Sequence, residues 1–513
     1  MAVLMILGID LGTTYTVTAG IDATGRPVTL PNSLGDHTTP SVVHFDSPDR
    51  VLVGVAAKNA STVDPDNTVA LIKRRMGTEL DLFFHGVRHT PESVSALILR
   101  GAVGNATGVR AVITVPAYFG IREREATFQA AALAGIEVLE LLSEPVAAAL
   151  HYSTAVPDSA TTTLVYDLGG GTFDTTVLKA GDHGVDVVAT DGDSHLGGAD
   201  WDARIASYLL ENFARAVPDV DPYEDETFLN EMTSLAEKVK RDLSRVASRK
   251  VALRCGGATA SVEIDRTTIE AMGVDLVDRT LEITRRVLAS ARDRGVLRVG
   301  AVILVGGSSR MPAIARALHA ELGVEPRLVE PDLAVAYGAA IRAHQLAGQS
   351  ELRKAGGRLS AIAQGSTRSV VPRSFGVLVE DSHDPSGQGR LVVHTVHRND
   401  PLPASATTRF STIVDGQDRV RVQIYEQAGD LPSSDVAHNR RVLDGELSGL
   451  PPLAAGSHVE VTLSVSADGL LSVSAREPRS GVTLDLQSYV DGVVDGSAHV
   501  ELAASLAGVT VSQ

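Results

Sequence analysis

The chain has 513 residues, of which 44% are hydrophobic and 21% charged, and its formal net charge is −17. This length predicts two to four domains, and the acidic balance argues against nucleic acid as the main partner, because phosphate neutralisation requires a clustered basic surface. The single cysteine, Cys255, excludes a disulfide within the chain and a cysteine zinc site, and it fits a reducing compartment.

The sequence carries no pattern of export or membrane insertion. The first residues, MAVLMILGID, are apolar, but they lack a basic segment and run directly into a glycine-containing turn. No stretch approaches the roughly 18 apolar residues that cross a bilayer. We therefore expect a cytoplasmic protein without a membrane partner.

In residues 1–345 strand patterns alternate with helix patterns, which is typical of an α/β fold. This arrangement occurs twice, once in each half of the region. The first half, about 1–155, contains the strand patterns PSVVHF, RVLVG and VRAVITVP. It also contains the helical pattern IREREATFQAAALAG and a helix start at Ser143-Glu144-Pro145. The second half, about 160–345, contains the helical pattern TFLNEMTSLAEKVKRDLSRVA, the strand–helix pair AVILVGGSSRMPAIARALHAEL and the closing helix DLAVAYGAAIRAHQLA.

The pattern changes after residue 345. Residues 346–369 are rich in Gly, Ser and basic residues and predict a linker. Residues 370–490 contain short strand patterns such as SFGVLVE, RVRVQIYEQ and HVEVTLSVS, separated by Gly, Asp and Pro turns, and predict an all-β domain. Residues 491–513 are too few for a further helical domain.

Each half of the α/β region opens with nearly the same segment, LGIDLGTTYTVTAGIDATG and LVYDLGGGTFDTTVLKAGDHG. In both, an apolar strand ends in Asp-Leu-Gly, a tight turn follows, and a second strand ends at Gly. A turn without bulky side chains lets backbone N–H groups approach a phosphate. Two matched hairpins therefore predict a duplicated nucleotide-binding core that clamps a polyphosphate and its cation.

The hairpins supply the first candidate residues. Asp10 and Asp167 hold equivalent strand ends and would bind Mg²⁺ through waters. A lone Asp before Gly merely closes a turn, but its repetition in matched loops favours the metal. The phosphate cradle is expected at Thr13, Thr14, Gly169, Gly170, Gly171 and Thr172.

Three further groups are candidates for hydrolysis. Glu144 and Asp174 could orient a water and accept its proton, because positioning and electrostatics dominate phosphoryl transfer. Glu144 could equally be an acid that favours a helix N-terminus. Lys73 could stabilise charge on the terminal phosphate, although a lone lysine is more often solvated surface.

The segment Gly306-Gly307-Ser308-Ser309-Arg310 follows an apolar strand and precedes a helix. It offers a flat surface and an arginine for a base and ribose, and the alternative is an ordinary turn between a strand and a helix. The histidines form no site, since His394 and His397 lie three apart in a strand and face opposite sides. Metalloprotease and acyl-transfer motifs are absent.

Together these motifs resemble those of the seventy-kilodalton heat-shock chaperones (the DnaK type) in the actin-like ATPase superfamily. Within residues 1–345 the resemblance rests on the motifs GIDLGTTY, ITVPAYFG, LSEPVAAALHY, YDLGGGTFDTTVL, GDSHLGGADWD, EKVKRDLS, VILVGGSSRMP and PDLAVAYGAA. Beyond residue 345 it rests on TRFSTIVDGQ, VQIYE, GLPP and VTLSVSADGLLSVSA. The resemblance implies a two-lobed, ribonuclease H-like duplicated ATPase domain followed by a β-sandwich. In the family, ATP opens the sandwich for extended apolar peptides and hydrolysis traps them.

The resemblance also implies residue roles. It gives Asp10, Asp167, Thr13, Thr172, Glu144, Asp174 and Lys73 the phosphate, Mg²⁺ and hydrolysis roles considered above. The nucleotide contacts it implies are Gly12, Tyr15, Gly198, Glu237, Lys240, Arg241, Ser244, Gly306, Gly307, Ser308, Arg310 and Asp332. Pro116 and Arg124 match the pair that relays the nucleotide state. The peptide channel, or equally the sandwich core, would contain Phe410, Val420, Val422 and Val465.

Three of the chain's departures from the family pattern bear on its partners and coupling. The linker lacks the family's short acidic and apolar stretch, the helical lid is expected to be missing, and Glu140 stands where the family usually has a basic residue that meets J-domain co-chaperones. These departures argue against standard interdomain coupling, strong peptide trapping and a standard J-domain partner. The resemblance also implies a nucleotide exchange factor as a partner.

Three functions are compatible with these patterns. The first is a lidless chaperone-like ATPase that binds ATP and Mg²⁺ and holds apolar peptide in its β-domain. The second is a nucleotide-gated adaptor for one dedicated protein partner, which the linker, the missing lid and Glu140 favour. The third is a small-molecule kinase of the same superfamily, against which the β-domain and the full set of motifs argue.

Overall fold

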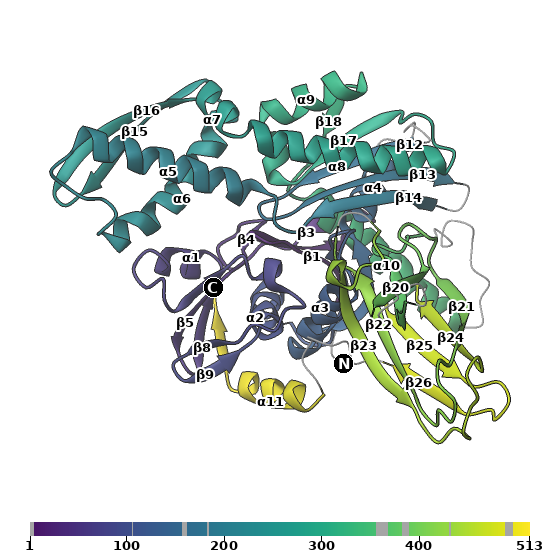
Figure 1. The fold of residues 1–513 in the computed structure, drawn as a ribbon. Helices are drawn as coiled ribbons and strands as arrows, with labels where there is room; N and C mark the ends of the chain where they lie inside the picture. The colour runs from purple at the N-terminus through teal and green to yellow at the C-terminus, as the bar shows by residue number, and fades with distance from the viewer. Residues whose placement is uncertain are drawn as a thin grey trace.

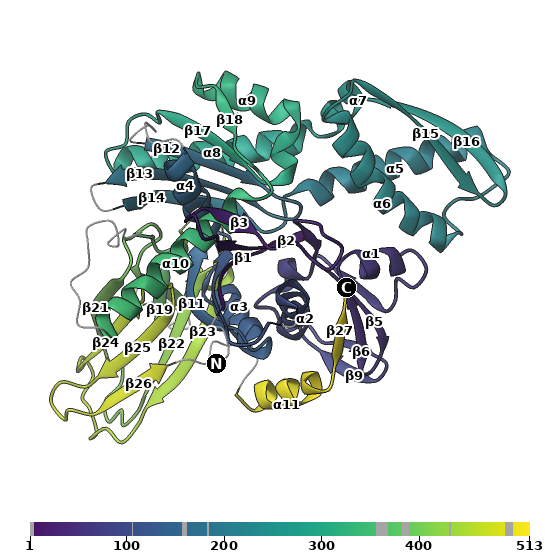
Figure 2. The same cartoon turned by 180° about the vertical axis from the view of Figure 1, so that it is seen from behind.

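The structure is a computed structural model that describes residues 5–104, 106–155, 162–181, 184–354, 368–381, 389–429, 432–487 and 496–513. It contains two α/β lobes, a β-domain packed beside them, and a C-terminal segment that returns to the first lobe (Figures 1 and 2). Among the described residues, no helix combines the length and the apolar composition that a membrane span requires.

Lobe I is built on a sheet with the strand order β11-β10-β1-β2-β3, in which β4 also pairs with β2. Its strands are β1 (Met5–Leu11), β2 (Tyr15–Ile21), β3 (Pro27–Thr29), β4 (Thr39–Pro40), β10 (Val109–Val115) and β11 (Glu137–Ser143). β1, β10 and β11 are parallel, whereas β1 and β2 form an antiparallel hairpin. The residues that follow β1, β10 and β11 therefore meet at one edge of the sheet.

The rest of lobe I consists of helices on this sheet and a smaller outer part. The helices are α2 (Pro91–Val103) and α3 (Ile121–Leu133). The outer part contains β5 (Val42–Ser47), β6 (Arg50–Val53), α1 (Val55–Ala60), β7 (Thr68–Ala70), the 3₁₀ helix η1 (Ile72–Arg75), β8 (Leu82–Phe84) and β9 (Val87–His89). The predicted stop of α3 is confirmed, because Gly135 follows it with a positive φ of 76°.

Lobe II repeats the hairpin arrangement. Its five-stranded sheet has the order β14-β13-β12-β17-β18, with β12 and β13 antiparallel and β12 and β17 parallel. The strands are β12 (Thr162–Leu168), β13 (Phe173–Gly181), β14 (Gly184–Asp193), β17 (Ala301–Val305) and β18 (Pro326–Leu328). Helices α8 (Val274–Asp293) and α9 (Pro312–Leu322) and the 3₁₀ helix η2 (Gly307–Arg310) complete this part.

An outer part of lobe II projects from the sheet (Figure 1). It consists of α5 (Gly198–Ala216), α6 (Glu226–Leu243), the antiparallel pair β15 (Ser248–Cys255) and β16 (Ala258–Asp265), and α7 (Arg266–Met272). Trp201, Phe213 and Phe228 are buried in its aliphatic core. The long helix predicted at 227–247 is confirmed, although it begins at Glu226 and ends at Leu243, after an N-cap at Asp225.

Helices α4 (Glu144–Ala155) and α10 (Ala334–Lys354) lie between the two sheets. Their small buried residues, Ala147 and Ala339 among them, pack with Val112 of one lobe and Val165 of the other. α10 continues well past residue 345, so the predicted start of the linker at 346 is wrong. Glutamine, leucine, glutamate, arginine and lysine in this stretch are good helix formers, and a single glycine does not interrupt the helix.

The β-domain has two four-stranded sheets, ordered β20-β19-β22-β23 and β21-β24-β25-β26, that enclose one core. The strands are β19 (Phe375–Glu380), β20 (Arg390–Val396), β21 (Ala404–Ser411), β22 (Val420–Gln427), β23 (Asn439–Leu447), β24 (His458–Val465), β25 (Leu471–Arg476) and β26 (Thr483–Gln487), with the 3₁₀ helix η4 (Val436–His438) before β23. The alternating apolar pattern in the sequence accounts for this arrangement.

The segment after the β-domain forms α11 (Gly496–Ala507) and β27 (Thr510–Ser512). β27 pairs in parallel with β6, so the outer sheet of lobe I has the order β27-β6-β5-β7. Both views place α11 along lobe I, away from the β-domain (Figures 1 and 2). The sequence predicted a short tail here, but not its place in this sheet.

Candidate functional site

The two hairpin tips face each other across the space between the lobes. A Cβ added at Gly170 would lie 1.8 Å from Thr14 Oγ1, and one added at Gly171 would lie 2.3 Å from the Thr13 methyl carbon. Only glycine permits this approach, which explains the bare turn in the sequence. The Gly169 N–H donates to the Thr172 carbonyl oxygen at 3.0 Å and closes the second tip.

The hydroxyl groups of Thr13 and Thr14 are buried at this contact. Neither Oγ1 atom has a hydrogen-bond partner among the described residues. A buried hydroxyl without a partner is costly, and a phosphate oxygen would satisfy it. The two tips therefore fit the phosphate cradle expected from the sequence.

Parallel strand ends bring the acidic groups of lobe I together. Asp10 follows the buried part of β1, and Thr114 near the end of β10 donates a 2.9 Å hydrogen bond to its Oδ1 atom. Glu144 is the first residue of α4, directly after β11. The topology, rather than proximity in sequence, thus explains why these groups share one edge.

Lys73 and Glu144 form a buried ion pair. Lys73 Nζ lies 2.6 Å from Glu144 Oε1, and both residues are only 6% exposed. Lys73 also lies over the Phe119 ring at 5.7 Å from its centroid. The alternative that Lys73 is solvated surface is therefore wrong, because its ammonium group is held inside the cleft.

Asp174 approaches the same centre from lobe II. It is the second residue of β13 and lies opposite Asp167 in register. Its Oδ1 atom accepts the backbone N–H of Ala117 at 2.9 Å and that of Tyr118 at 3.4 Å. One carboxylate oxygen is thereby fixed by lobe I, directly after Pro116.

Three carboxyl groups in this cluster have raised pKa values. Burial, followed by the charge of Glu144, raises the pKa of Asp10 to about 7. The same two causes raise the pKa values of Asp167 and Asp174 well above their ordinary range. The positive charge of Lys73 therefore does not balance the buried carboxyl groups of this site. A bound cation would stabilise their ionised forms.

This donor set suits a hydrated cation. Within the part of the chain that the structure describes, no three acidic, histidine or cysteine side chains converge closely enough to ligate a metal directly. Mg²⁺ keeps several waters and takes one or two carboxylates together with phosphate oxygens. Asp10 and Asp167 therefore fit the water-mediated Mg²⁺ binding predicted from the sequence.

A third glycine-rich segment completes the lobe II side. A Cβ added at Gly306, whose φ is 80°, would lie 2.4 Å from Asp167 Oδ1. One added at Gly198 would lie 2.3 Å from Ser308 Oγ and 2.6 Å from Lys240 Nζ. The predicted residues Gly198, Ser308 and Lys240 are thus adjacent, and Gly306 adjoins the metal candidate.

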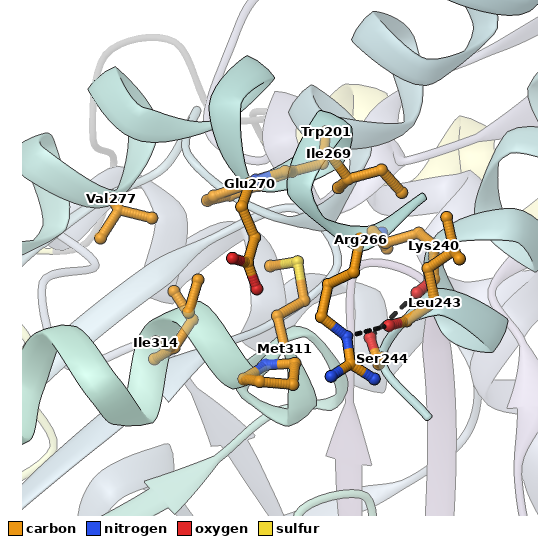
Figure 3. A pocket seen from close by; sticks show the side chains of 12 residues that line it. Trp201, Lys240, Leu243, Ser244, Arg266, Ile269, Glu270, Val277, Met311 and Ile314 are labelled. Atoms are coloured by element: carbon orange, nitrogen blue, oxygen red, sulfur yellow. Dashed lines mark hydrogen bonds between the residues drawn. The ribbon is translucent and has the colours of Figure 1, made fainter. Parts of the chain in front are cut away.

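A pocket lies beside this segment, between α6, α7 and the start of α9 (Figure 3). Predicted base or ribose residues Lys240 and Ser244 contribute to its wall, but most of the lining is apolar. The other lining residues are Trp201, Leu243, Arg266, Ile269, Glu270, Val277, Met311, Pro312, Ala313 and Ile314. Its apolar wall and few polar groups suit a flat aromatic base.

Lys240 is already engaged. Its Nζ atom donates to the Gly198 carbonyl oxygen at 2.8 Å and to Asp202 Oδ2 at 2.9 Å. It therefore joins α5 to α6 beside the pocket. Sequence reasoning missed Asp202, whose position one helical turn into α5 carried no distinguishing signal.

The rim of the cleft is bridged by polar contacts. Glu237 accepts hydrogen bonds from Tyr15 Oη at 3.0 Å and from Lys58 Nζ at 2.5 Å, which joins lobe II to lobe I. Arg241 is exposed one turn later. On the other side, Arg310 pairs with Asp332 at 2.5 Å, next to Gly307.

Sequence reasoning missed Arg74, which directly follows Lys73. Its Nε atom donates to the Gly171 carbonyl oxygen at 2.7 Å, and its Nη2 atom donates to Asp200 Oδ2 at 2.9 Å. Arg74 therefore holds the phosphate turn of lobe II from lobe I. The basic run Lys73-Arg74-Arg75 was the available signal in the sequence.

The first turn of α3 docks the β-domain. Arg124 is 3% exposed; its Nε atom donates to the Phe119 carbonyl oxygen at 3.0 Å and its Nη1 atom to the Asp468 carbonyl oxygen at 3.3 Å. Ile121 is buried in the β-domain core. Its N–H donates to Glu426 Oε1 at 2.9 Å, so a β-domain carboxylate caps the helix.

An ion-pair network surrounds this cap. Arg440 lies 2.7 Å from Glu426 and 3.2 Å from Glu123, and Glu426 has no exposed surface. A Cβ added at Gly120 would lie 2.3 Å from Glu426 Oε1. We call Ile121, Glu123, Arg124, Glu426, Arg440 and Asp468 the docking interface. Pro116 directly precedes the N–H groups that hold Asp174, and Arg124 is itself part of this interface.

The chain before the β-domain also contacts a lobe. The Val187 N–H donates to the Arg368 carbonyl oxygen at 2.8 Å, and the Arg368 N–H donates to the Val185 carbonyl oxygen at 3.2 Å. Residue 368 therefore adds to the edge of β14. Most of the predicted linker, 355–367, lies outside the described residues.

The candidate peptide residues lie mainly in the core. Val422 and Val465 are each 1% exposed within the β-domain core, and Phe410 and Val420 are half-buried against it. By contrast, Ile413 and Val414, in the connection from β21 to β22, are 66% and 55% exposed. The exposed apolar surface of this region is therefore at the loop.

Glu140 does not present a free charge. Its Oε2 atom accepts a 2.8 Å hydrogen bond from Arg342 Nε of α10. Burial raises the pKa of Glu140, and Asp468 of the docking interface contributes to this shift. The residue that departs from the family pattern thus lies close to the docking interface.

Comparison with protein families gives a match over most of the chain. The family model described as Hsp70 protein matches residues 6–94 and 80–494. The matched ranges include both hairpins, the docking interface and the whole β-domain.

Proposed function

Because the chain belongs to the Hsp70 family, we propose that it is an ATP-dependent chaperone-like protein that hydrolyses ATP with Mg²⁺ and binds extended apolar peptide through its β-domain. The observation that carries the ATPase part is the meeting of two phosphate turns around the buried Lys73–Glu144 pair and three carboxyl groups with raised pKa values.

Each group has a distinct part in the proposed hydrolysis. Thr13, Thr14 and the glycine tips bind the phosphates, and Mg²⁺, when bound through Asp10 and Asp167, neutralises phosphate charge. Glu144 holds Lys73 where its ammonium group stabilises charge on the terminal phosphate. Asp174 has one oxygen fixed by backbone N–H groups, so its other oxygen can orient a water and accept its proton.

Single-turnover ATP hydrolysis with Mg²⁺ tests this assignment. We expect Lys73→Ala and Asp174→Asn to lower the rate constant by about 100-fold or more, while ATP binding persists. Lys179→Ala, at an exposed position of β13, is the matched control and should hydrolyse at the wild-type rate. Wild-type rates in both site variants would refute the assignment.

The proposal that the β-domain binds peptide is based on the loop between β21 and β22. Ile413 and Val414 are adjacent exposed apolar residues on a surface loop, whereas most apolar residues of the sandwich are buried. An extended apolar peptide would cover them at the point where β21 turns into β22. The docking interface gives this domain a direct contact with α3, whose preceding residues hold Asp174.

A second candidate is a nucleotide-gated adaptor for one protein partner. The observation that favours it is the Glu140–Arg342 pair, which replaces the basic surface expected for a standard J-domain partner. A dedicated adaptor would not suppress aggregation of unrelated proteins. Broad suppression by the purified chain would therefore support the chaperone over the adaptor.

A further inference from the structure

The segment 496–513 is built into lobe I. Leu502 and Leu506 of α11 are 4% and 0% exposed and belong to the apolar core of that lobe. β27 extends the sheet beyond β6, with Val511 opposite Val51. An added strand of this kind satisfies an edge that would otherwise present unpaired backbone groups.

Polar contacts secure the same segment. Arg100 of α2 donates from Nη1 to the Leu506 carbonyl oxygen at 2.6 Å and from Nη2 to the Leu133 carbonyl oxygen at 3.0 Å. These carbonyls lie in the last turns of α11 and α3, where a cation is favourable. Gln513 donates to the Gly101 carbonyl oxygen at 2.6 Å and accepts the Ser33 N–H at 2.9 Å.

The β-domain is consequently attached at both of its ends. Residue 368 pairs with β14 of lobe II before the first strand, and α11 and β27 lie on lobe I after the last. The connection from Gln487 to Gly496 contains residues 488–495. Its greatest reach is about 30 Å, from roughly 3.3–3.6 Å for each residue step.

We propose that residues 496–513 form an intramolecular clasp that holds the β-domain at the docking interface. While the clasp is closed, breaking the contact between Ile121 and Glu426 lets the β-domain move only as far as the connection 488–495 can extend. With the clasp open, the domain is held at one end alone and turns away from α3. The clasp is made of one short helix and a three-residue strand, and small units of this size open locally.

The direct test is to lengthen the connection without changing the clasp or the docking interface. We would insert 24 Gly and Ser residues within 488–495 and measure hydrogen exchange at the Ile121 N–H, which is bonded across the interface. A longer tether lowers the effective concentration of the β-domain at its site, so exchange should accelerate roughly three- to tenfold. The control is the same insertion between Gly256 and Gly257, in the turn from β15 to β16.

A second variant distinguishes release of the clasp from a structural change transmitted along α3, because Arg100 also binds the last carbonyl group of α3. Arg100→Ala should loosen α11 and accelerate Ile121 exchange in the chain of natural length. In the lengthened chain the same substitution should leave Ile121 unchanged, because the clasp no longer restrains the domain. Equal Ile121 exchange in the lengthened and control chains, or an equal Arg100→Ala effect in both backgrounds, would overturn the proposal. Neither measurement needs ATP, so the result is independent of the proposed hydrolysis.

Discussion

At the scale of single residues, Asp10 has the clearest consequence for stability. Its pKa in the folded protein is about 7, above the value of 3.8 expected when it is unfolded. The folded state therefore binds this proton more tightly. The resulting stabilisation is fully present below the unfolded value and is lost as the pH rises through the folded value.

We predict that Asp10→Asn removes this pH dependence. Without nucleotide and divalent cation, the wild type should lose about 1 to 2 kcal/mol of unfolding free energy relative to Asp10→Asn between pH 5 and pH 7, a discounted value because Asp10 partly faces the cleft. Denaturant unfolding of both proteins at several pH values measures the difference. Parallel stability profiles would contradict it.

Candidate residues were easiest to propose where a motif repeats. Asp10, Asp167 and the glycine tips became candidates because each motif occurs twice, and the structure brings them together. Glu144 and Lys73 remained ambiguous until the fold placed them 2.6 Å apart, from β11–α4 and from η1. Arg74 and Asp202 were missed because a charged residue in a helical turn has no distinctive pattern before its partner is known.

At the scale of elements, the junction between α3 and the β-domain depends on Gly120. A methyl group at this position would meet the Glu426 carboxylate, which caps α3 and pairs with Arg440. We predict that Gly120→Ala weakens docking by about 1 to 3 kcal/mol, because the carboxylate must move and leaves buried partners unsatisfied.

Hydrogen exchange at the Ile121 N–H and small-angle scattering measure this effect. Exchange should become faster and the average dimensions should increase. Gly348→Ala is the matched control, since its Cβ would meet no atom within 4 Å and alanine favours the α10 helix. Unchanged docking in Gly120→Ala would show that Glu426 accommodates the methyl group without losing the cap.

Element types followed from the sequence more readily than element boundaries. The period-2 and period-3.6 patterns identified the hairpins, α3 and α6, but α10 extends to Lys354 through residues whose composition resembled a linker. The pairing of β27 with β6 joins residues 510–512 to 50–52. A three-residue strand carries too little pattern to predict such a distant partner.

At the scale of the whole molecule, the structure connects the cleft to the β-domain by a short path. Asp174 is held by the N–H groups after Pro116, and the same loop leads into α3 and the docking interface. The atypical linker sequence gave no indication of this contact. The proposed coupling would run through the contact between α3 and the sandwich, which could not be predicted from the linker composition.

The most direct test of this account is single-turnover hydrolysis of ATP with Mg²⁺ by the full chain, with and without an extended apolar peptide. The account predicts that peptide accelerates hydrolysis at least severalfold in the wild type. It also predicts that Ile413→Ser with Val414→Ser abolishes this acceleration but keeps the basal rate, because both residues are exposed and lie in the β21–β22 connection, outside the two lobes that form the cleft. Hydrolysis that proceeds in the wild type but does not respond to peptide would contradict coupling and favour the dedicated-partner adaptor.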